Sequence, residues 1–348
     1  MSALGMAKKV LLTPIWTAAI LTGAKSFRSN PVLASPRLNR MGLHRFRLER
    51  AAAMSAYRRR RLAHLLSETH VAAFERDGYV VIKDVLPPQE FAALSQAVEN
   101  TAFPAHENRQ GDTLNRFCGL PPEIVATIPE LQRLLANPLF NALLRYAASF
   151  NHVPMFNLNT VITVPGTGAH DPNTVFHSDT FHAVGKGWFF LRDVEMADGP
   201  FSFVPGSHKL TPARIEWEQD LSQRAARDAD PLNTIGSFRV TSAEIAAMGY
   251  GEAVPFPVPA NSLVVADTHG FHARALSTRP SVRLAVYGSL RSNPFMPLTG
   301  VDLFQLPGLK GRKSDAINLA RAIAAKASGR RLEQPPVGLV RPGDPALR

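Results

Sequence analysis

The sequence predicts a mainly β protein with a helical cover (α+β), in which a jelly roll follows a set of N-terminal helices. From about residue 156 onward, short segments rich in β-branched and aromatic residues follow one another closely, with Gly and Pro turns between them. Helical periodicity is concentrated before that point. No regular crossover helices separate the later strands, which favours a sandwich or barrel over βαβ units.

Length and composition indicate a globular chain with a substantial core. The chain has 348 residues, of which 45% are hydrophobic and 19% are charged. Cys118 is the only cysteine. This excludes an intramolecular disulfide and any zinc or iron–sulfur site built from cysteines. A single cysteine also fits a reducing compartment, so we predict a cytoplasmic location.

The net charge of +11 is concentrated at the N-terminus. Residues 1–65 hold thirteen basic residues and one acid, Glu49, so this segment carries +12 and the rest of the chain −1. We therefore expect a basic arm over residues 1–65, a jelly-roll domain over 66–298, and a C-terminal helix and tail over 299–348. Because the body is not basic, we expect no nucleic-acid partner.

The arm begins with an apolar run, residues 10–21, that follows Lys8 and Lys9 and is interrupted by Pro14. The run is too short for a transmembrane helix. Two alternatives remain open. The favoured one is a helix packed on the domain with its arginines in solvent. The other is an interfacial anchor that gives peripheral membrane contact through residues 1–65. If the body carries the function, we expect activity to survive deletion of residues 1–65; if the basic arm carries it, we expect all function to be lost.

The elements before residue 156 follow from periodicity and from proline breaks. Apolar residues three or four apart predict helices, and a run of β-branched residues predicts a strand that Pro87 and Pro88 end. Pro129 and Pro138 divide the last helical stretch. The expected order is helix 67–74, strand 78–86, helix 89–99, polar loop 100–117, and two or three short helices over 121–149.

The later elements are mostly short strands bounded by turn residues. The prolines of residues 253–260 predict that this extended segment lies at a sheet edge. The expected order is strand 156–164, a His-containing strand 174–182, strands 187–194 and 201–204, charged helix 211–232, strand 238–240, helix 242–248, edge segment 253–260, strands 263–266 and 282–290, and helix 315–326. No structure is assigned to the tail that follows.

The segment 174–182 carries two metal-ligand side chains, His177 and Asp179, two residues apart. In a β-strand their side chains point to the same face. Together they are two of the three ligands of a 2-His-1-carboxylate facial triad. Such a triad holds Fe(II) and leaves positions open for O2 and a co-substrate.

A third ligand is expected from a late strand, where His269 and His272 are the candidates. Arg283 lies eleven residues beyond His272, and its guanidinium can fork two N–H bonds onto the distal carboxylate of a dicarboxylate co-substrate. His182 would lie on the opposite face of its strand, so we expect a substrate-side or structural role for it. His208 sits in a turn, and we expect it to cap that turn or to support the metal ligands rather than to bind the metal.

Four local patterns occur in one order along the chain. They are residues 74–82, His177-Ser-Asp179, Gly199-Pro200 through Pro205-Gly-Ser-His208, and His272 followed by Arg283. In these patterns, over roughly residues 70–292, the sequence resembles the phytanoyl-CoA dioxygenase family. Members of that family are Fe(II)/2-oxoglutarate-dependent oxygenases with a double-stranded β-helix (jelly-roll, cupin-like) fold.

The resemblance implies an iron-dependent dioxygenase that uses O2 and 2-oxoglutarate, hydroxylates a small-molecule or lipid-like substrate, and releases succinate and CO2. Related halogenases lack the carboxylate ligand, so Asp179 favours hydroxylation or desaturation. The implied site residues are His177, Asp179 and His272 on Fe(II), Arg283 on 2-oxoglutarate, Trp188 lining the co-substrate pocket, and Asn159 as a second polar contact.

Arg274 departs from the family pattern, because the residue two after the distal His is often small. Arg274 could point away, bind an acidic group of the substrate, or reshape the pocket. Two other functions stay open at this point: a catalytically inactive jelly-roll binding module, and a membrane-associated adaptor that uses the basic arm.

Overall fold

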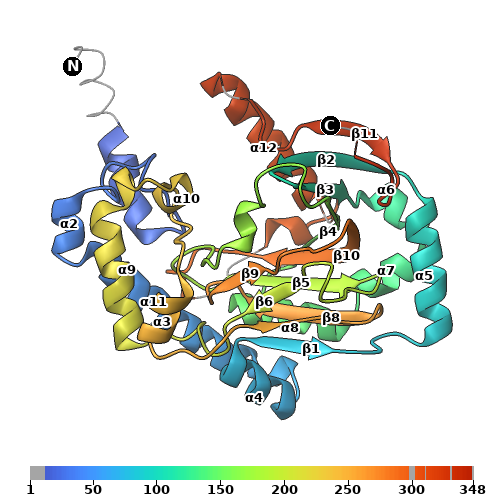
Figure 1. The fold of residues 1–348 in the computed structure, drawn as a ribbon, viewed down its shortest axis with the longest axis horizontal. Coiled ribbons are helices and arrows are strands. Elements are labelled where there is room, and N and C mark those ends of the chain that lie inside the picture. The colour runs from blue at the N-terminus through green and yellow to red at the C-terminus, as the bar shows by residue number, and fades with distance from the viewer. Residues whose placement is uncertain (1–11, 298–301, 310, 330, 347–348) are drawn as a thin grey trace.

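The centre of the molecule is an antiparallel sheet of eight strands, in the order β1-β8-β5-β10-β4-β3-β2-β11, accompanied by a small sheet in the order β7-β6-β9 (Figure 1). The structure is a computed structural model and describes residues 12–297, 302–309, 311–329 and 331–346. The strands are β1 (Tyr79–Ile82), β2 (Phe103–Gln110), β3 (Thr113–Gly119), β4 (Met155–Thr163), β5 (Gly185–Phe190), β6 (Phe201–Phe203), β7 (Val254–Pro255), β8 (Ser262–Asp267), β9 (His272–Arg274), β10 (Ser281–Leu290) and β11 (Pro336–Val340).

Alternation along the strands gives the large sheet two different faces. In β8, Leu263 and Val265 belong to the core shared with the helices, whereas Val264 and Ala266 belong to the core shared with the small sheet. The sheet thus packs against helices on one side and against β6 and β7 on the other. The prediction of a mainly β fold with a helical cover is confirmed.

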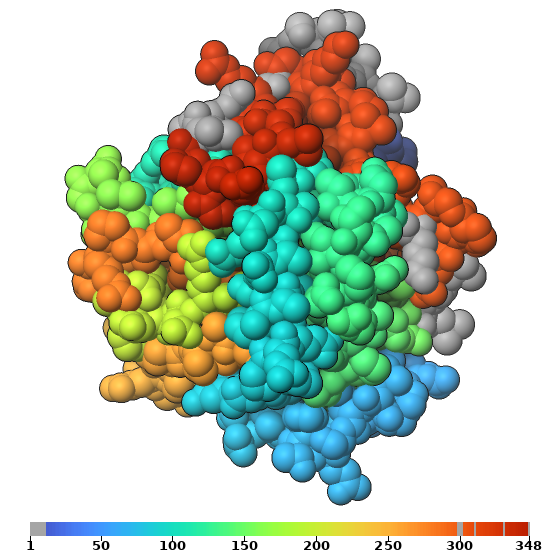
Figure 2. Space-filling view, turned by 90° about the vertical axis from the view of Figure 1, so that its right-hand side faces the viewer, coloured from blue at the N-terminus to red at the C-terminus, as the bar shows by residue number. Residues whose placement is uncertain are grey.

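Helices close the outer face of the large sheet. The helix α8 packs against β5 and β8 there, and Figure 2 shows, at the end of the strands, the cyan segment that contains α5 beside the green segment that contains α6 to α8. The helices are α2 (Pro36–Arg40), α3 (Leu43–Leu62), α4 (Glu68–Asp77), α5 (Pro88–Asn100), α6 (Pro122–Val125), α7 (Pro129–Leu135), α8 (Pro138–Ala148), α9 (Pro212–Arg224), α10 (Pro231–Thr234), α11 (Ser242–Ala247) and α12 (Lys313–Ser328).

The prediction of a loop over residues 100–117 was wrong, because β2 and β3 form a hairpin there. In β2, Phe103, Ala105 and Glu107 are buried and alternate with more exposed residues. Glu107 pairs at 2.6 Å with Arg116 of β3, and both side chains are fully buried. The polar character that suggested a loop therefore belongs to a paired hairpin.

The expectation that the arginines of the N-terminal arm are solvated was wrong for Arg47, Arg58 and Arg59, whereas the other described arginines of the arm are exposed. Arg58 and Arg59 on α3 are buried. The Arg58 guanidinium donates to the Ser149 carbonyl at 2.7 Å, and that of Arg59 pairs with the Asp267 carboxylate at 2.6 Å. Because such partners offset the loss of hydration, a strongly basic helix can pack against the body.

The apolar run 10–21 is described only from residue 12, and from there it is helical. Among the described residues, no helix combines the length and the hydropathy needed to cross a bilayer.

The C-terminal tail adds the last strand of the large sheet. The β11 strand pairs with β2, with Val340 opposite Phe103. Beyond it, the carbonyls of Pro342 and Asp344 accept hydrogen bonds from the buried Arg116 guanidinium. The helix expected at 315–326 is present as α12.

Candidate metal centre and its cavity

Backbone pairing holds the two candidate histidines together although they lie far apart in the sequence. His177 and His272 exchange N–H···O bonds of 3.0 Å in both directions. His272 is also paired with Phe203 of β6, and the Asp179 N–H donates to the Thr268 carbonyl at 3.0 Å. The expected strand 174–182 was wrong, since His177 forms only isolated bridges. Backbone bonds across the molecule, rather than one strand, orient these residues.

The three side chains converge on one point. One ligand atom each from His177, Asp179 and His272 lies within 4.8 Å of the other two. The two imidazole centroids are 4.3 Å apart, and His272 Nε2 is 3.8 Å from Asp179 Oδ1. Both histidines are buried, whereas Asp179 is partly exposed. Two imidazole nitrogens and one carboxylate oxygen are the donor set of the Fe(II) facial triad, so these residues fit that metal.

Backbone carbonyls select the nitrogen that each imidazole presents. The Nδ1 atom of His177 is 2.8 Å from the Val175 carbonyl, and that of His272 is 2.9 Å from the Gly270 carbonyl. A carbonyl only accepts hydrogen bonds, so each Nδ1 carries the proton. The lone pair of each ring is then on Nε2, which is available to a metal.

Burial keeps both imidazoles neutral. It lowers the pKa of His272 to about 4, and burial and the neighbouring His272 hold the pKa of His177 well below its usual range. Burial opposes ionisation of Asp179, but the charge of Lys186 and then the imidazoles hold its pKa well below the ordinary carboxyl value. At neutral pH the cluster therefore offers two neutral nitrogen donors and one carboxylate.

Two lysines contact Asp179, and sequence reasoning missed both. Lys186 Nζ on β5 is 2.6 Å from Asp179 Oδ2, while Lys25 Nζ donates to the Asp179 carbonyl at 2.5 Å. Since Oδ2 faces Lys186 and Oδ1 faces His272, the two carboxylate oxygens have different neighbours. Strand alternation could have found Lys186, because it lies two residues before Trp188. Nothing local in the sequence indicates Lys25.

The cluster opens into a cavity of about 400 Å³ that Trp188, Asn159 and Arg283 also line. The Trp188 ring lies 4.7 Å from the Phe201 ring, between centroids. Arg283 donates to the Gly199 carbonyl, and its Nε has no hydrogen-bond partner among the described residues. All six candidate site residues thus face one cavity.

His269, His182 and His208 lie outside this cluster. His269 Nε2 is 3.8 Å from Glu218 Oε1, His182 Nδ1 contacts the Ala183 carbonyl, and the His208 ring packs on Phe74. Of the two candidates on the late segment, the structure brings His272, and not His269, next to His177 and Asp179.

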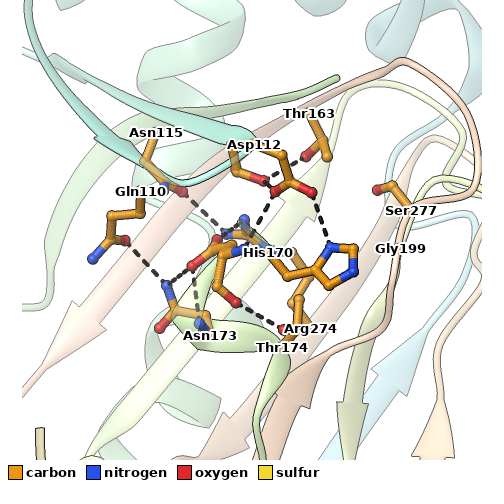
Figure 3. A network of polar contacts seen from close by, with 12 residues as sticks. Gln110, Asp112, Asn115, Thr163, His170, Asn173, Thr174, Gly199, Arg274 and Ser277 are labelled. Carbon is orange, nitrogen blue, oxygen red and sulfur yellow. Dashed lines mark hydrogen bonds and ion pairs between the residues drawn. The ribbon is translucent and has the colours of Figure 1, made fainter. Parts of the chain in front are cut away.

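Arg274 is paired within the protein. Its guanidinium forms an ion pair with the buried Asp171 carboxylate and donates to Asn115 Oδ1 at 3.0 Å. Figure 3 shows Arg274 and Asn115 in a polar network that also contains His170 and Asp112. The network joins the segment before His177 to the strand that carries His272.

Amide side chains that sequence reasoning missed form the far wall of the cavity. Asn108 of β2 lies directly opposite Asn115 of β3, and Gln110 and Asn173 line the same wall. In the sequence, three of these residues fall within the segment wrongly expected to be a loop. Alternation in β2 was the signal that could have revealed them.

Comparison with known proteins gives one family and several distant structures. Residues 74–273 match the phytanoyl-CoA dioxygenase (PhyH) family. The epimerase SnoN in complex with Fe3+, alpha ketoglutarate and nogalamycin RO is 20% identical, over 71% of this chain and 91% of that one, with a TM-score of 0.42. HygX from Streptomyces hygroscopicus with nickel and 2-oxoglutarate bound is 15% identical, over 70% and 94%, with a TM-score of 0.39. No curated protein matches the chain in sequence.

Proposed function

Because the chain belongs to the phytanoyl-CoA dioxygenase (PhyH) family, it is an Fe(II)/2-oxoglutarate-dependent enzyme, and we propose that it hydroxylates a small molecule rich in hydrogen-bonding groups. The observation that carries this proposal is the convergence of His177, Asp179 and His272, with ligand atoms within 4.8 Å of one another, at a cavity that Arg283 also lines.

In this proposal, His177 and His272 hold Fe(II) through Nε2, and Asp179 holds it through Oδ1. Fe(II) held by these residues would supply the oxidising chemistry together with O2 and 2-oxoglutarate, with succinate and CO2 as the co-products. Lys186 fixes the other carboxylate oxygen at 2.6 Å and so orients Asp179. The carboxylate ligand favours hydroxylation or desaturation of a C–H bond.

Arg283 is the residue that we assign to the distal carboxylate of 2-oxoglutarate. Its side chain is buried, it lines the cavity, and it forms no ion pair with a carboxylate of the described residues. A guanidinium can form two parallel N–H···O bonds with a carboxylate, which a lysine cannot. Trp188 would exclude water beside the co-substrate, and Asn159 would supply a second polar contact.

The far wall of the cavity supports a polar substrate over a lipid. Asn108, Gln110, Asn115 and Asn173 each offer both donor and acceptor groups, which match hydroxyl and amide groups of a ligand. Asn115 already accepts from Arg274, and Asn173 already donates to Asp171. An acyl chain would offer no partner to the remaining amide groups, and each amide left unpaired in a closed site costs about 1–3 kcal/mol. A cavity of about 400 Å³ has little room for 2-oxoglutarate and a large substrate together, so the molecule that is hydroxylated is small.

The test is succinate release from 2-oxoglutarate by the full chain, with and without Fe(II), in the presence of the water-soluble or the lipid fraction of a metabolite extract. We expect iron-dependent succinate release that the water-soluble fraction stimulates. Stimulation by the lipid fraction alone would contradict the substrate class. Absence of both iron binding and succinate release would reject the enzymatic function of this site.

A further inference from the structure

Two guanidinium groups line the cavity, but their partners differ. Arg274 on β9 is engaged by the Asp171 carboxylate and by Asn115. Arg283 on β10 donates to one backbone carbonyl, that of Gly199, and its Nε has no partner among the described residues. One arginine is therefore neutralised by the protein, while the other keeps its charge for a ligand.

The Asp171 carboxylate is held in place and cannot turn away from the arginines. Asp171 is 1% exposed, and its Oδ1 accepts hydrogen bonds from the Asn173 N–H at 2.9 Å and from Asn173 Nδ2 at 2.8 Å. Its own N–H donates to Asp112 Oδ1 at 3.3 Å. A buried carboxylate fixed in this way requires a cation beside it.

Asp171 acts on both arginines. Arg274 is the residue it binds directly. Burial and the charge of Arg274 hold the pKa of Arg283 well below its usual range, and the carboxylates of Asp171 and Asp198 oppose that shift. The other carboxylate near Arg283 is Asp198, which Arg279 binds with contacts of 2.8 and 3.2 Å. Because Asp198 is already bound by Arg279, Asp171 is the carboxylate left to balance the charge of Arg274 or of Arg283.

We propose that Arg274 is a positioning residue that occupies Asp171 and thereby leaves Arg283 free for the distal carboxylate of 2-oxoglutarate. This inference rests on the role proposed for Arg283. Without the guanidinium at position 274, the fixed carboxylate of Asp171 competes with the co-substrate for Arg283 and repels its carboxylate.

The test is the dissociation constant of 2-oxoglutarate, measured by titration calorimetry with the Fe(II)-loaded protein in the absence of O2. Arg274→Gln is expected to raise that constant about tenfold or more, which corresponds to about 1.4 kcal/mol. The double variant Arg274→Gln with Asp171→Asn removes the competing charge and is expected to return to within about threefold of the original protein. Loss of packing alone would not be rescued by a second substitution.

Arg192→Gln is the matched control, because Arg192 pairs with Glu99 at 3.0 Å and does not line the cavity. It is expected to leave the constant unchanged. Unaltered binding in Arg274→Gln would overturn the proposal, as would a double variant as weak as the single one. Arg283→Ala separates this failure from failure of the proposed function, because unchanged 2-oxoglutarate binding in that variant rejects the role of Arg283 itself.

If Arg274→Gln does not fold, Arg274→Lys is measured in its place, because it keeps one positive charge beside the Asp171 carboxylate. Binding close to that of the original protein supports the proposal, and binding weakened tenfold contradicts it. Iron content and circular dichroism of every variant establish that metal binding and fold are retained.

Discussion

At the scale of single residues, the chemistry depends on how backbone atoms fix side-chain tautomers. The carbonyls of Val175 and Gly270 hold Nδ1 of His177 and His272, so the opposite nitrogens face each other and Asp179. The contacts that fix this arrangement are made within the protein itself. A preorganised site of this kind loses little conformational freedom on binding its ligand.

His177→Ala and Asp179→Ala are each expected to abolish iron binding and succinate release together, because two remaining ligands leave an incomplete triad. Metal content of the purified protein and a succinate assay measure the two effects. His64→Ala changes an exposed histidine and serves as the control. Retention of a full equivalent of iron in either variant would mean that the metal is held elsewhere.

A second residue-scale feature is the buried carboxylate of Glu218, which contacts the His44 imidazole at 3.1 Å and Arg214 at 3.1 Å. Burial opposes its ionisation, but the neighbouring imidazoles of His269 and His44 and the charge of Arg214 hold the pKa of Glu218 well below the ordinary value. Since the folded-state pKa is the lower one, the ionised group stabilises the fold above the unfolded pKa of about 4.3, and this contribution is lost as the pH falls toward the folded value.

Glu218→Gln is therefore expected to lower the free energy of unfolding by about 3 kcal/mol at pH 7, the cost of breaking a buried ion pair. The difference from the original protein should shrink as the pH falls below about 4. Urea unfolding at several pH values measures it. A difference that stays constant down to acid pH would contradict an ionised Glu218.

At the scale of secondary-structure elements, the hairpin β2–β3 and the tail strand β11 build one wall of the cavity. Gln334, just before β11, lines the same cavity as Asn108. Arg116 in β3 depends on acceptors beyond β11, including the carbonyl of Pro345 at 2.7 Å. The end of the described chain is thus part of the site rather than an appendage to it.

Deletion of residues 331–348 is expected to lower the melting temperature by roughly 5 °C or more, because it uncovers the edge of β2 and leaves the buried Arg116 without its carbonyl acceptors. Thermal unfolding followed by circular dichroism measures this. Removal of residues 346–348 alone keeps those acceptors and is the control. Equal melting temperatures for the two truncations would show that β11 contributes nothing to stability.

The sequence indicated the elements with strong local patterns and missed those stabilised over long distances. Runs of β-branched residues predicted strands such as β4 and β10. Spacing along the chain predicted the site residues His177, Asp179, His272 and Arg283. The hairpin was missed because several of its residues that line the cavity are amides, which made the segment look like a polar loop. Lys25 and β11 were missed because their partners lie far away in sequence, which no local pattern encodes.

At the scale of the whole molecule, the basic N-terminal segment is integrated into the body. Arg59 reaches from α3 to Asp267, whose other oxygen accepts from the N–H groups of Val184 and His269. Asp267 ends β8 and begins the turn that leads to His272. The division of the chain at residues 65 and 298 stays a proposal, and the contacts of α3 indicate that residues 66–298 need this helix.

Arg59→Met is expected to lower the free energy of unfolding by about 3–5 kcal/mol, because it leaves the Asp267 carboxylate buried without its cation. Deletion of residues 1–65 is expected to prevent folding, contrary to the sequence-based expectation that activity survives. Arg60→Met is the matched control, since the neighbouring Arg60 is exposed. Equal stability of the two variants in urea would show that the pair with Asp267 is dispensable.

The mutual backbone bonds between His177 and His272 also bear on the order of events during folding. They close a long loop that contains β5, β6 and β8, and the entropy lost on closing a loop rises with its length. Contacts of such high sequence separation are late events in the folding of β proteins. Iron would then bind only to nearly native chains, because its three ligands come together late. The rate of metal uptake during refolding would therefore report the rate of the final folding stage.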